Sequence, residues 1–231
     1  MIKVNELTFS YPRKGNLFDK LSLGLPAGEI IGLLGRNGVG KSTLIKLLSS
    51  LLTPQQGVIY FQGKAITRGA ELYSRLMVVP EEFTLPKVTV SSFVRHTAPL
   101  YPAFSQQQFD YYCNVLEVDC SAKFSDLSMG QRKKAYLAFA LACNVELLLL
   151  DEPTKGIDSF FKLQFAEIMD KLKAQGVTII MVSHDVEFCA RYADTVSMFF
   201  DGGIVTTNTP NRFFSGNSFY TTAANRMSRH L

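Results

Sequence analysis

One nine-residue stretch, residues 35–43, constrains the fold of this chain more than any other. It reads Gly-Arg-Asn-Gly-Val-Gly-Lys-Ser-Thr and fits the pattern G-x-x-x-x-G-K-S/T. An apolar run at residues 30–34 precedes it and predicts a buried strand, and residues 43–48 after it predict a helix. Because the N–H groups and the dipole of a helix N-terminus attract anions, this arrangement predicts a phosphate-binding loop.

The residues of this loop have separate expected roles. Lys41 would reach the β- and γ-phosphates of a nucleoside triphosphate, and the Ser42 hydroxyl would bind Mg²⁺. The alternative is a glycine-rich turn with an unrelated lysine, which the flanking strand and helix disfavour. The residues predicted to contact the nucleotide are Gly35, Arg36, Asn37, Gly38, Val39, Gly40, Lys41, Ser42 and Thr43.

Length and composition limit the class of protein. The 231 residues, 47% apolar and 19% charged, suit a globular protein with a sizeable core. The net charge of +4 is too small to indicate nucleic-acid binding by itself. No apolar run approaches the ~20 residues that span a bilayer, and the first residues do not resemble a signal peptide. We therefore expect a soluble chain that needs a partner for any role at a membrane.

The four cysteines show no C-x-x-C pair and no metal-binding spacing with the three histidines. We expect free, mostly buried thiols in a reducing compartment.

Strands and helices alternate along most of the chain. Apolar runs at residues 76–79, 147–150 and 177–182 predict buried strands, with helical patterns between them. This alternation predicts an α/β fold with a mostly parallel sheet and phosphates at the C-terminal ends of its strands. Residues 82–131 interrupt the pattern with prolines and a helix, and we interpret them as a helical insertion.

Two of the expected helices carry residues that favour a helix start. Ser105, with Gln108 three residues later, predicts a capping box. Asp158 or Ser159 is expected to cap a later helix, which Gly176 is expected to end.

A second nucleotide motif follows the leucines at residues 147–150. Asp151, at the end of this strand, would hold Mg²⁺, and Glu152 would polarise a water molecule that attacks the γ-phosphate. A carboxylate pair of this kind can also belong to a helix-capping turn, but the phosphate-binding loop elsewhere in the chain favours the nucleotide interpretation.

A third motif, Leu-Ser-Met-Gly-Gln at residues 127–131, precedes a predicted helix. With the three motifs in this order, nearly the whole chain resembles the nucleotide-binding subunit of an ATP-binding cassette (ABC) transporter. The resemblance implies a P-loop NTPase fold with a mostly parallel central sheet, an antiparallel β subdomain and an inserted helical subdomain. It implies one ABC ATPase domain over residues 1–231, divided into a core at 1–81 and 132–207, a helical subdomain at 82–131 and a tail at 208–231.

The resemblance also implies roles for residues outside the phosphate-binding loop. Tyr11 matches the aromatic residue that stacks on adenine, and His184 matches the switch histidine that contacts the γ-phosphate. Asp158 matches the loop that communicates across the dimer. The family's signature sequence, which contacts ATP held by the other subunit, is matched by Ser128, Gly130 and Gln131. The implied catalytic residues are Lys41, Glu152 as the general base, and His184.

Two positions depart from the family pattern. Met129 stands where the signature sequence usually has its first glycine, and we expect little loss because Ser128 and Gly130 make the contacts. Glu81 stands where the family has a glutamine that helps to bind Mg²⁺. A carboxylate keeps the oxygen ligand but adds a negative charge near the phosphates, so we hypothesise that Glu81 makes ATP binding more dependent on Mg²⁺.

The two parts of the chain resemble different branches of the family. Through about residue 144 the chain resembles ATPases of two-component exporters, and the last third, including residues 213–220, resembles those of energy-coupling-factor importers. The segment expected to meet a permease, residues 81–104, lies in the exporter-like part and favours that class. This segment has four aromatic residues: Phe83, Phe93, Tyr101 and Phe104. They either accept a permease helix or form the core of the insertion.

The function implied by the resemblance is a cytoplasmic ATPase subunit, held at the inner face of the cell membrane by a separate permease. Two copies, or one copy and a paralogue, would pair head to tail around ATP and Mg²⁺. The alternative is a soluble ABC ATPase that acts on nucleic acid or ribosomes. A single cassette without a long coiled coil or zinc-binding cysteines disfavours that alternative, so we expect no nucleic-acid partner.

Overall fold

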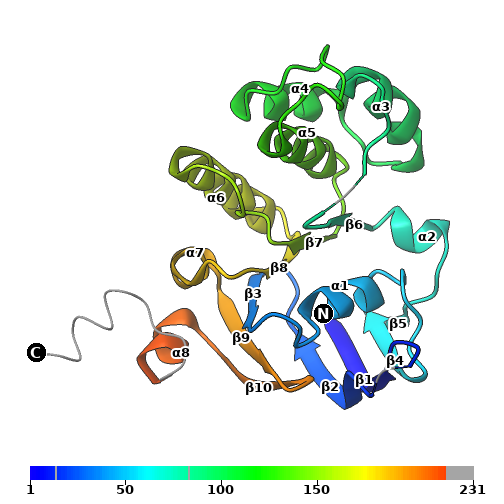
Figure 1. Cartoon of the computed structure of the whole chain (residues 1–231), viewed down its shortest axis with the longest axis vertical. Helices are drawn as coiled ribbons and strands as arrows, with labels where there is room; N and C mark the ends of the chain where they lie inside the picture. Colours follow the sequence, from blue (N-terminus) through cyan, green and yellow to red (C-terminus); the bar gives the residue numbers. More distant parts are fainter. Residues whose placement is uncertain (14, 83, 217–231) are drawn as a thin grey trace, which may run out of the picture.

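The computed structural model describes residues 1–13, 15–82 and 84–216, which form two sheets and several helices (Figure 1). The smaller sheet is antiparallel, with its strands in the order β2-β1-β4-β5. Its buried residues pack against one face of the larger sheet, so the predicted antiparallel β subdomain is confirmed. The strands are β1 (Ile2–Phe9), β2 (Phe18–Leu25), β4 (Gln56–Phe61) and β5 (Lys64–Ala65).

The larger sheet has the order β10-β9-β3-β8-β7-β6. Every neighbouring pair is parallel except β9 and β10, which form an antiparallel hairpin. All residues of β3, β7 and β8 are buried, which explains why these strands appear in the sequence as continuous apolar runs. The strands are β3 (Ile30–Gly35), β6 (Leu76–Val79), β7 (Leu147–Asp151), β8 (Thr178–Val182), β9 (Thr195–Phe200) and β10 (Gly203–Asn208).

The helices form two groups. Figure 1 shows the green helices of the segment between β6 and β7 set apart from the two sheets, as expected for an insertion. This group consists of α3 (Val90–Thr97), η1 (Ala98–Leu100), α4 (Gln106–Val115) and α5 (Met129–Ala142). The others follow the strands of the core: α1 (Lys41–Leu48), α2 (Ala70–Tyr73), α6 (Ser159–Ala174), α7 (Val186–Tyr192) and α8 (Pro210–Gly216).

The helix caps differ in part from the expectation. At α4, Ser105 accepts a hydrogen bond from the Gln108 N–H at 3.3 Å, but Gln108 Oε1 is buried and has no hydrogen-bond partner in the described residues, so the predicted capping box is only half formed. A complete capping box lies at α5 instead, between Ser128 and Gln131, because this helix begins at Met129. Asp158, rather than Ser159, caps α6.

Most of the aromatic residues of the insertion lie in its core. The rings of Phe93 and Phe104 are 5.3 Å and 5.8 Å from the ring of Phe139, measured between centroids. Tyr101 contacts Phe139 as well, and its hydroxyl lies 3.1 Å from the sulfur of Met77. The structure therefore favours the core interpretation for these residues, while Phe83 lies outside the described residues, as do residues 217–231 of the predicted tail.

The cysteines are free, as predicted. Cys113, Cys143 and Cys189 are buried and Cys120 is half-buried. No helix among the described residues has both the length and the apolar composition needed to cross a membrane.

The order of the parallel strands brings the predicted motifs to one edge of the sheet. The phosphate-binding loop follows β3, and Asp151 ends β7, two strands away. His184 follows β8, which lies between them, and Glu81 follows β6 at the edge of the sheet. Because these strands run parallel, their C-terminal ends form one site, as expected for a sheet of this type.

Candidate active site

The phosphate-binding loop has a backbone that requires glycine at defined positions. Gly38 and Gly40 have φ of +83° and +109°, in the region that other residues rarely adopt. A Cβ at Gly40 would lie 2.6 Å from the ring of Phe18, and one at Gly35 would lie 2.5 Å from the carbonyl oxygen of Phe199. The helix α1 therefore begins without a side-chain cap, which leaves its first N–H groups free for an anion.

Lys41 is buried, with 6% of its surface exposed. Its Nζ donates hydrogen bonds to the carbonyl oxygens of Gly35 at 2.6 Å and Arg36 at 2.8 Å. Burial lowers the pKa of the Lys41 amine, and nearby carboxylates partly oppose this shift. Lys41 thus bridges its own loop in this structure, with its charge at the wall of the pocket.

Two buried carboxylates stand at the end of β7. Asp151 and Glu152 are 6% and 5% exposed. Burial raises the pKa of Asp151, although a hydrogen bond from Ser42 opposes the shift. Burial also raises the pKa of Glu152, and the backbone N–H of His184 opposes that shift. Both groups are thus easier to protonate here than in water.

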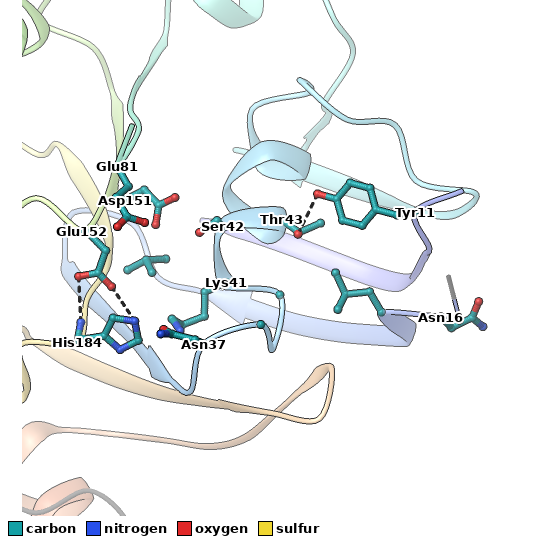
Figure 2. Close-up of a pocket in the computed structure, with 15 residues that line it drawn as sticks. Tyr11, Asn16, Asn37, Lys41, Ser42, Thr43, Glu81, Asp151, Glu152 and His184 are labelled. Carbon is teal, nitrogen blue, oxygen red and sulfur yellow. Dashed lines mark hydrogen bonds and ion pairs between the residues drawn. The ribbon is translucent and has the colours of Figure 1, made fainter. Parts of the chain in front are cut away.

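His184 is held against Glu152, as Figure 2 shows. The backbone N–H of His184 donates to Glu152 Oε2 at 3.2 Å, and the ring Nε2 lies 3.3 Å from Glu152 Oε1. The His184 side chain is 46% exposed, whereas that of Glu152 is 7% exposed. The pair therefore joins an accessible imidazole to a buried carboxylate, which the backbone N–H of His184 holds in place.

The oxygen atoms beside Lys41 suit a hard divalent cation. Asp151 Oδ1 is buried without a hydrogen-bond partner in the described residues, and buried polar atoms normally have one. The hydroxyl of Ser42 and the carboxylate of Glu81 line the same pocket. Mg²⁺ prefers oxygen ligands of this kind, so the residues fit the predicted metal site.

The far end of the pocket is formed by Tyr11 and the residues that follow it. The Tyr11 hydroxyl lies 3.2 Å from Thr43 Oγ1, and its ring packs edge-on against Phe9 at 5.0 Å between centroids. Figure 2 shows Tyr11 and Asn16 at one end and the carboxylates with His184 at the other. The sequence analysis did not single out Asn16 or its neighbour Leu17, which lie five and six positions after Tyr11.

These residues enclose a cavity of about 510 Å³, a volume typical of small-molecule sites. Most of the predicted nucleotide-binding residues line it, and three loop residues, Gly35, Arg36 and Val39, do not. The lining residues are Tyr11, Gly15, Asn16, Leu17, Asn37, Gly38, Gly40, Lys41, Ser42, Thr43, Glu81, Asp151, Glu152, Val182 and His184.

The other predicted contact residues lie outside this cavity, at the starts of two helices. Ser128 and Gln131 cap α5, with Gly130 between them, and Asp158 caps α6. Met129, in the middle of the signature sequence, is 71% exposed. The chain therefore presents these residues on its surface instead of to its own pocket.

Comparisons with known proteins agree with this arrangement. Residues 18–155 match the family described as "ABC transporter". A "Putative ABC transporter ATP-binding protein" of Bacillus thuringiensis subsp. konkukian is 32% identical, over 99% of this chain and 43% of that protein. A protein of the same description from Listeria monocytogenes serotype 4b is 33% identical, over 93% of this chain and 84% of that protein. The chain spans 43% of the length of several curated relatives that it matches.

A solved structure has the same fold. That of cbiO1 from Clostridium perfringens, described as part of the ABC transporter complex cbiONQ, superposes with a TM-score of 0.76 at 26% identity, over 93% of this chain and 90% of that chain. The predicted α/β fold is therefore confirmed.

Proposed function

This chain belongs to the ABC transporter family as one of its ATP-binding ATPases, and from that membership we propose how it binds and hydrolyses ATP. The loop at residues 36–40 and the start of α1 bind the phosphates through backbone N–H groups. Lys41 leaves the loop carbonyls and pairs with the β- and γ-phosphates. Tyr11 stacks on the base at the far end of the cavity, beside Asn16.

The proposed chemistry depends on Glu152 and His184. Glu152 accepts a proton from the attacking water, and its raised pKa makes it a stronger base than an exposed carboxylate. His184 orients the Glu152 carboxylate through its backbone N–H and holds the water and the γ-phosphate in line. Mg²⁺, held by Ser42, Asp151 and Glu81, would neutralise charge on the phosphates when bound.

The observation that carries the proposal is the division of the predicted residues between the cavity and the surface. The cavity holds the loop, both carboxylates and His184, whereas Ser128 and Gly130 lie elsewhere, at the start of α5. We infer that a second copy of this chain, or a paralogue, supplies its Ser128 and Gly130 to close each site. ATP binding then draws two subunits together, because each site is complete only in the pair.

Dilution tests this proposal. The rate of ATP hydrolysis per subunit is expected to fall as the protein is diluted below the dissociation constant of the dimer. Glu152→Gln is expected to form an ATP-dependent dimer that hydrolyses ATP slowly, which analytical ultracentrifugation would detect. A strictly monomeric sample with a constant rate per subunit at every dilution would contradict the proposal.

We further propose that the chain drives a separate membrane permease. A mostly apolar groove lies between the core and the inserted helices, lined by Leu51, Met77, Pro80 and Tyr136 among others. Leu51, which lines this groove, is 52% exposed, so part of the apolar lining is open to solvent. The groove would accept a short permease helix.

Membrane extraction tests this second part. The full chain is expected to co-purify with an integral membrane protein after mild solubilisation, and Leu51→Glu is expected to reduce the recovery of that protein without reducing ATP binding. Association that is lost on nuclease treatment would favour the nucleic-acid alternative instead.

A further inference from the structure

Glu81, which replaces the family's usual glutamine, has a lysine partner. Lys155 Nζ donates a hydrogen bond to Glu81 Oε1. The two residues are 74 positions apart: Glu81 follows β6, and Lys155 lies in the turn that follows Glu152. The Lys155 side chain is 61% exposed, whereas that of Glu81 is 33% exposed.

The position of Glu81 makes its charge important. It lines the cavity together with Asp151 and Glu152, so three carboxylates stand at the end where the phosphates are proposed to bind (Figure 2). An ATP molecule carries several negative charges, and like charges in a partly buried site repel strongly. A Glu81 side chain turned toward the phosphates would therefore oppose nucleotide binding.

We propose that Lys155 is a positioning residue that holds the Glu81 carboxylate toward the turn at residues 153–158 and offsets its charge. ATP then enters the cavity without first requiring a cation to neutralise Glu81. This inference rests on the proposed binding of ATP in this cavity. It also changes the expectation that Glu81 makes ATP binding more dependent on Mg²⁺, because Lys155 offsets the charge that would cause this dependence.

The size of the effect follows from the exposure of the pair. Ion pairs at the surface are partly screened by water and salt, so releasing Glu81 is expected to weaken metal-free binding only about two- to fivefold. When Glu81 is absent, the charge of Lys155 is screened by solvent even more strongly, because the Lys155 side chain is the more exposed of the two. Lys155 should therefore matter when Glu81 is present and much less when it is absent.

The test is equilibrium binding of AMP-PNP, which is not hydrolysed, in low salt with EDTA and again with Mg²⁺. The proteins are the wild type, Lys155→Gln, Glu81→Gln and the double variant. Lys87→Gln, which removes one positive charge from another exposed position, serves as the matched control. Unfolding temperatures without nucleotide verify that all five proteins are folded.

Lys155→Gln is expected to weaken metal-free binding about two- to fivefold, and Mg²⁺ is expected to remove most of this loss. In the Glu81→Gln background, Lys155→Gln is expected to change metal-free binding by less than about twofold. The control is expected to match the wild type. A purely structural role for Lys155 would alter the two metal conditions alike and would be independent of residue 81.

Two results would overturn this inference alone: equal effects of Lys155→Gln in the two backgrounds, or no effect on metal-free binding. If the folded wild type bound no AMP-PNP in either condition, the proposed nucleotide site would fail first and this inference with it.

Discussion

Lys133 offers a sharp test of how Glu152 is held. This lysine, in the first turns of α5, is 6% exposed, and its Nζ donates a hydrogen bond to the backbone carbonyl oxygen of Glu152. The backbone N–H of Lys155 donates to the same oxygen at 3.2 Å. Glu152 needs such support because its φ is +50°, a conformation that costs a non-glycine residue about 1–3 kcal/mol.

The perturbation is Lys133→Met, which keeps the length of the side chain but removes its charge. Losing a hydrogen bond from a charged donor costs about 1.5–3 kcal/mol. This loss is offset because burial lowers the pKa of Lys133, which shows that the folded chain disfavours its charged form. We therefore expect the free energy of unfolding to change by less than about 1–2 kcal/mol.

Catalysis is expected to suffer more than stability. A general base displaced by about 1 Å can lose about 10²-fold in rate, so kcat for ATP should fall about 10- to 100-fold, while KM should stay within about twofold. The assay is steady-state ATP hydrolysis at a fixed subunit concentration, with denaturant unfolding measured in parallel. Lys134→Met is the matched control, because Lys134 is next in the same helix and its Nζ lies 5.1 Å from the ring centroid of Phe161. An unchanged kcat, or equal losses of kcat in the two variants, would refute this role for Lys133.

Three further predictions follow from the site and its surroundings. Burial raises the pKa of Glu152 above its ordinary value of 4.5. Between pH 4.5 and the raised pKa, the folded chain without nucleotide therefore binds more protons than the unfolded chain, and its stability falls as the pH rises through this window. Glu152→Gln should therefore be more stable than the wild type at pH 7.5 and about equally stable near pH 4, as measured by denaturant unfolding; an equal gain at both pH values would contradict this sign. Gly40→Ala should abolish nucleotide binding and destabilise the fold by about 1–3 kcal/mol, because its Cβ would meet Phe18 and its φ is +109°; isothermal titration with ATP would show it, and normal affinity would contradict it. A thiol reagent should modify Cys120 first, because it is the least buried cysteine and burial raises the pKa of the other three thiols; earlier modification of Cys143 or Cys189 in the native protein would be inconsistent with the core packing.

The sequence was sufficient for the parts of the site that are local in the chain. The loop before Lys41, the carboxylates after the leucines of β7 and the histidine after β8 each stand beside an element with a clear apolar pattern. Because these strands are parallel and lie near one another in the sheet, their C-terminal ends bring these residues together. The inserted helices were also predictable, because their segment contains prolines and a helix-capping residue and interrupts the series of buried strands.

Contacts that depend on tertiary packing were not predictable from a single sequence. Nothing in the residues around Glu81 indicates a partner 74 positions away, and the pair exists only because β6 and β7 are neighbours. Asn16 reaches the cavity through a turn that has no periodic pattern. Gln108 failed to complete its capping box because its side-chain oxygen is buried, a consequence of packing that local spacing does not encode.

The central claim, that each site is completed by a second subunit, can be tested by mixing two inactive variants. Lys41→Ala removes the phosphate lysine but keeps the signature residues. Gly130→Asp keeps the lysine and places a negative charge in the signature sequence, and a Cβ at this position would make only an ordinary contact, 3.6 Å from the carbonyl oxygen of Gly156. In a mixed dimer, the loop of the second variant would face the intact signature sequence of the first.

Each variant alone is expected to hydrolyse ATP slowly. An equimolar mixture is expected to recover about a quarter of the wild-type rate, since random pairing makes half of the dimers mixed and each of these has one intact site. A mixture no faster than the sum of its two components, or full activity of Gly130→Asp alone, would contradict the shared site.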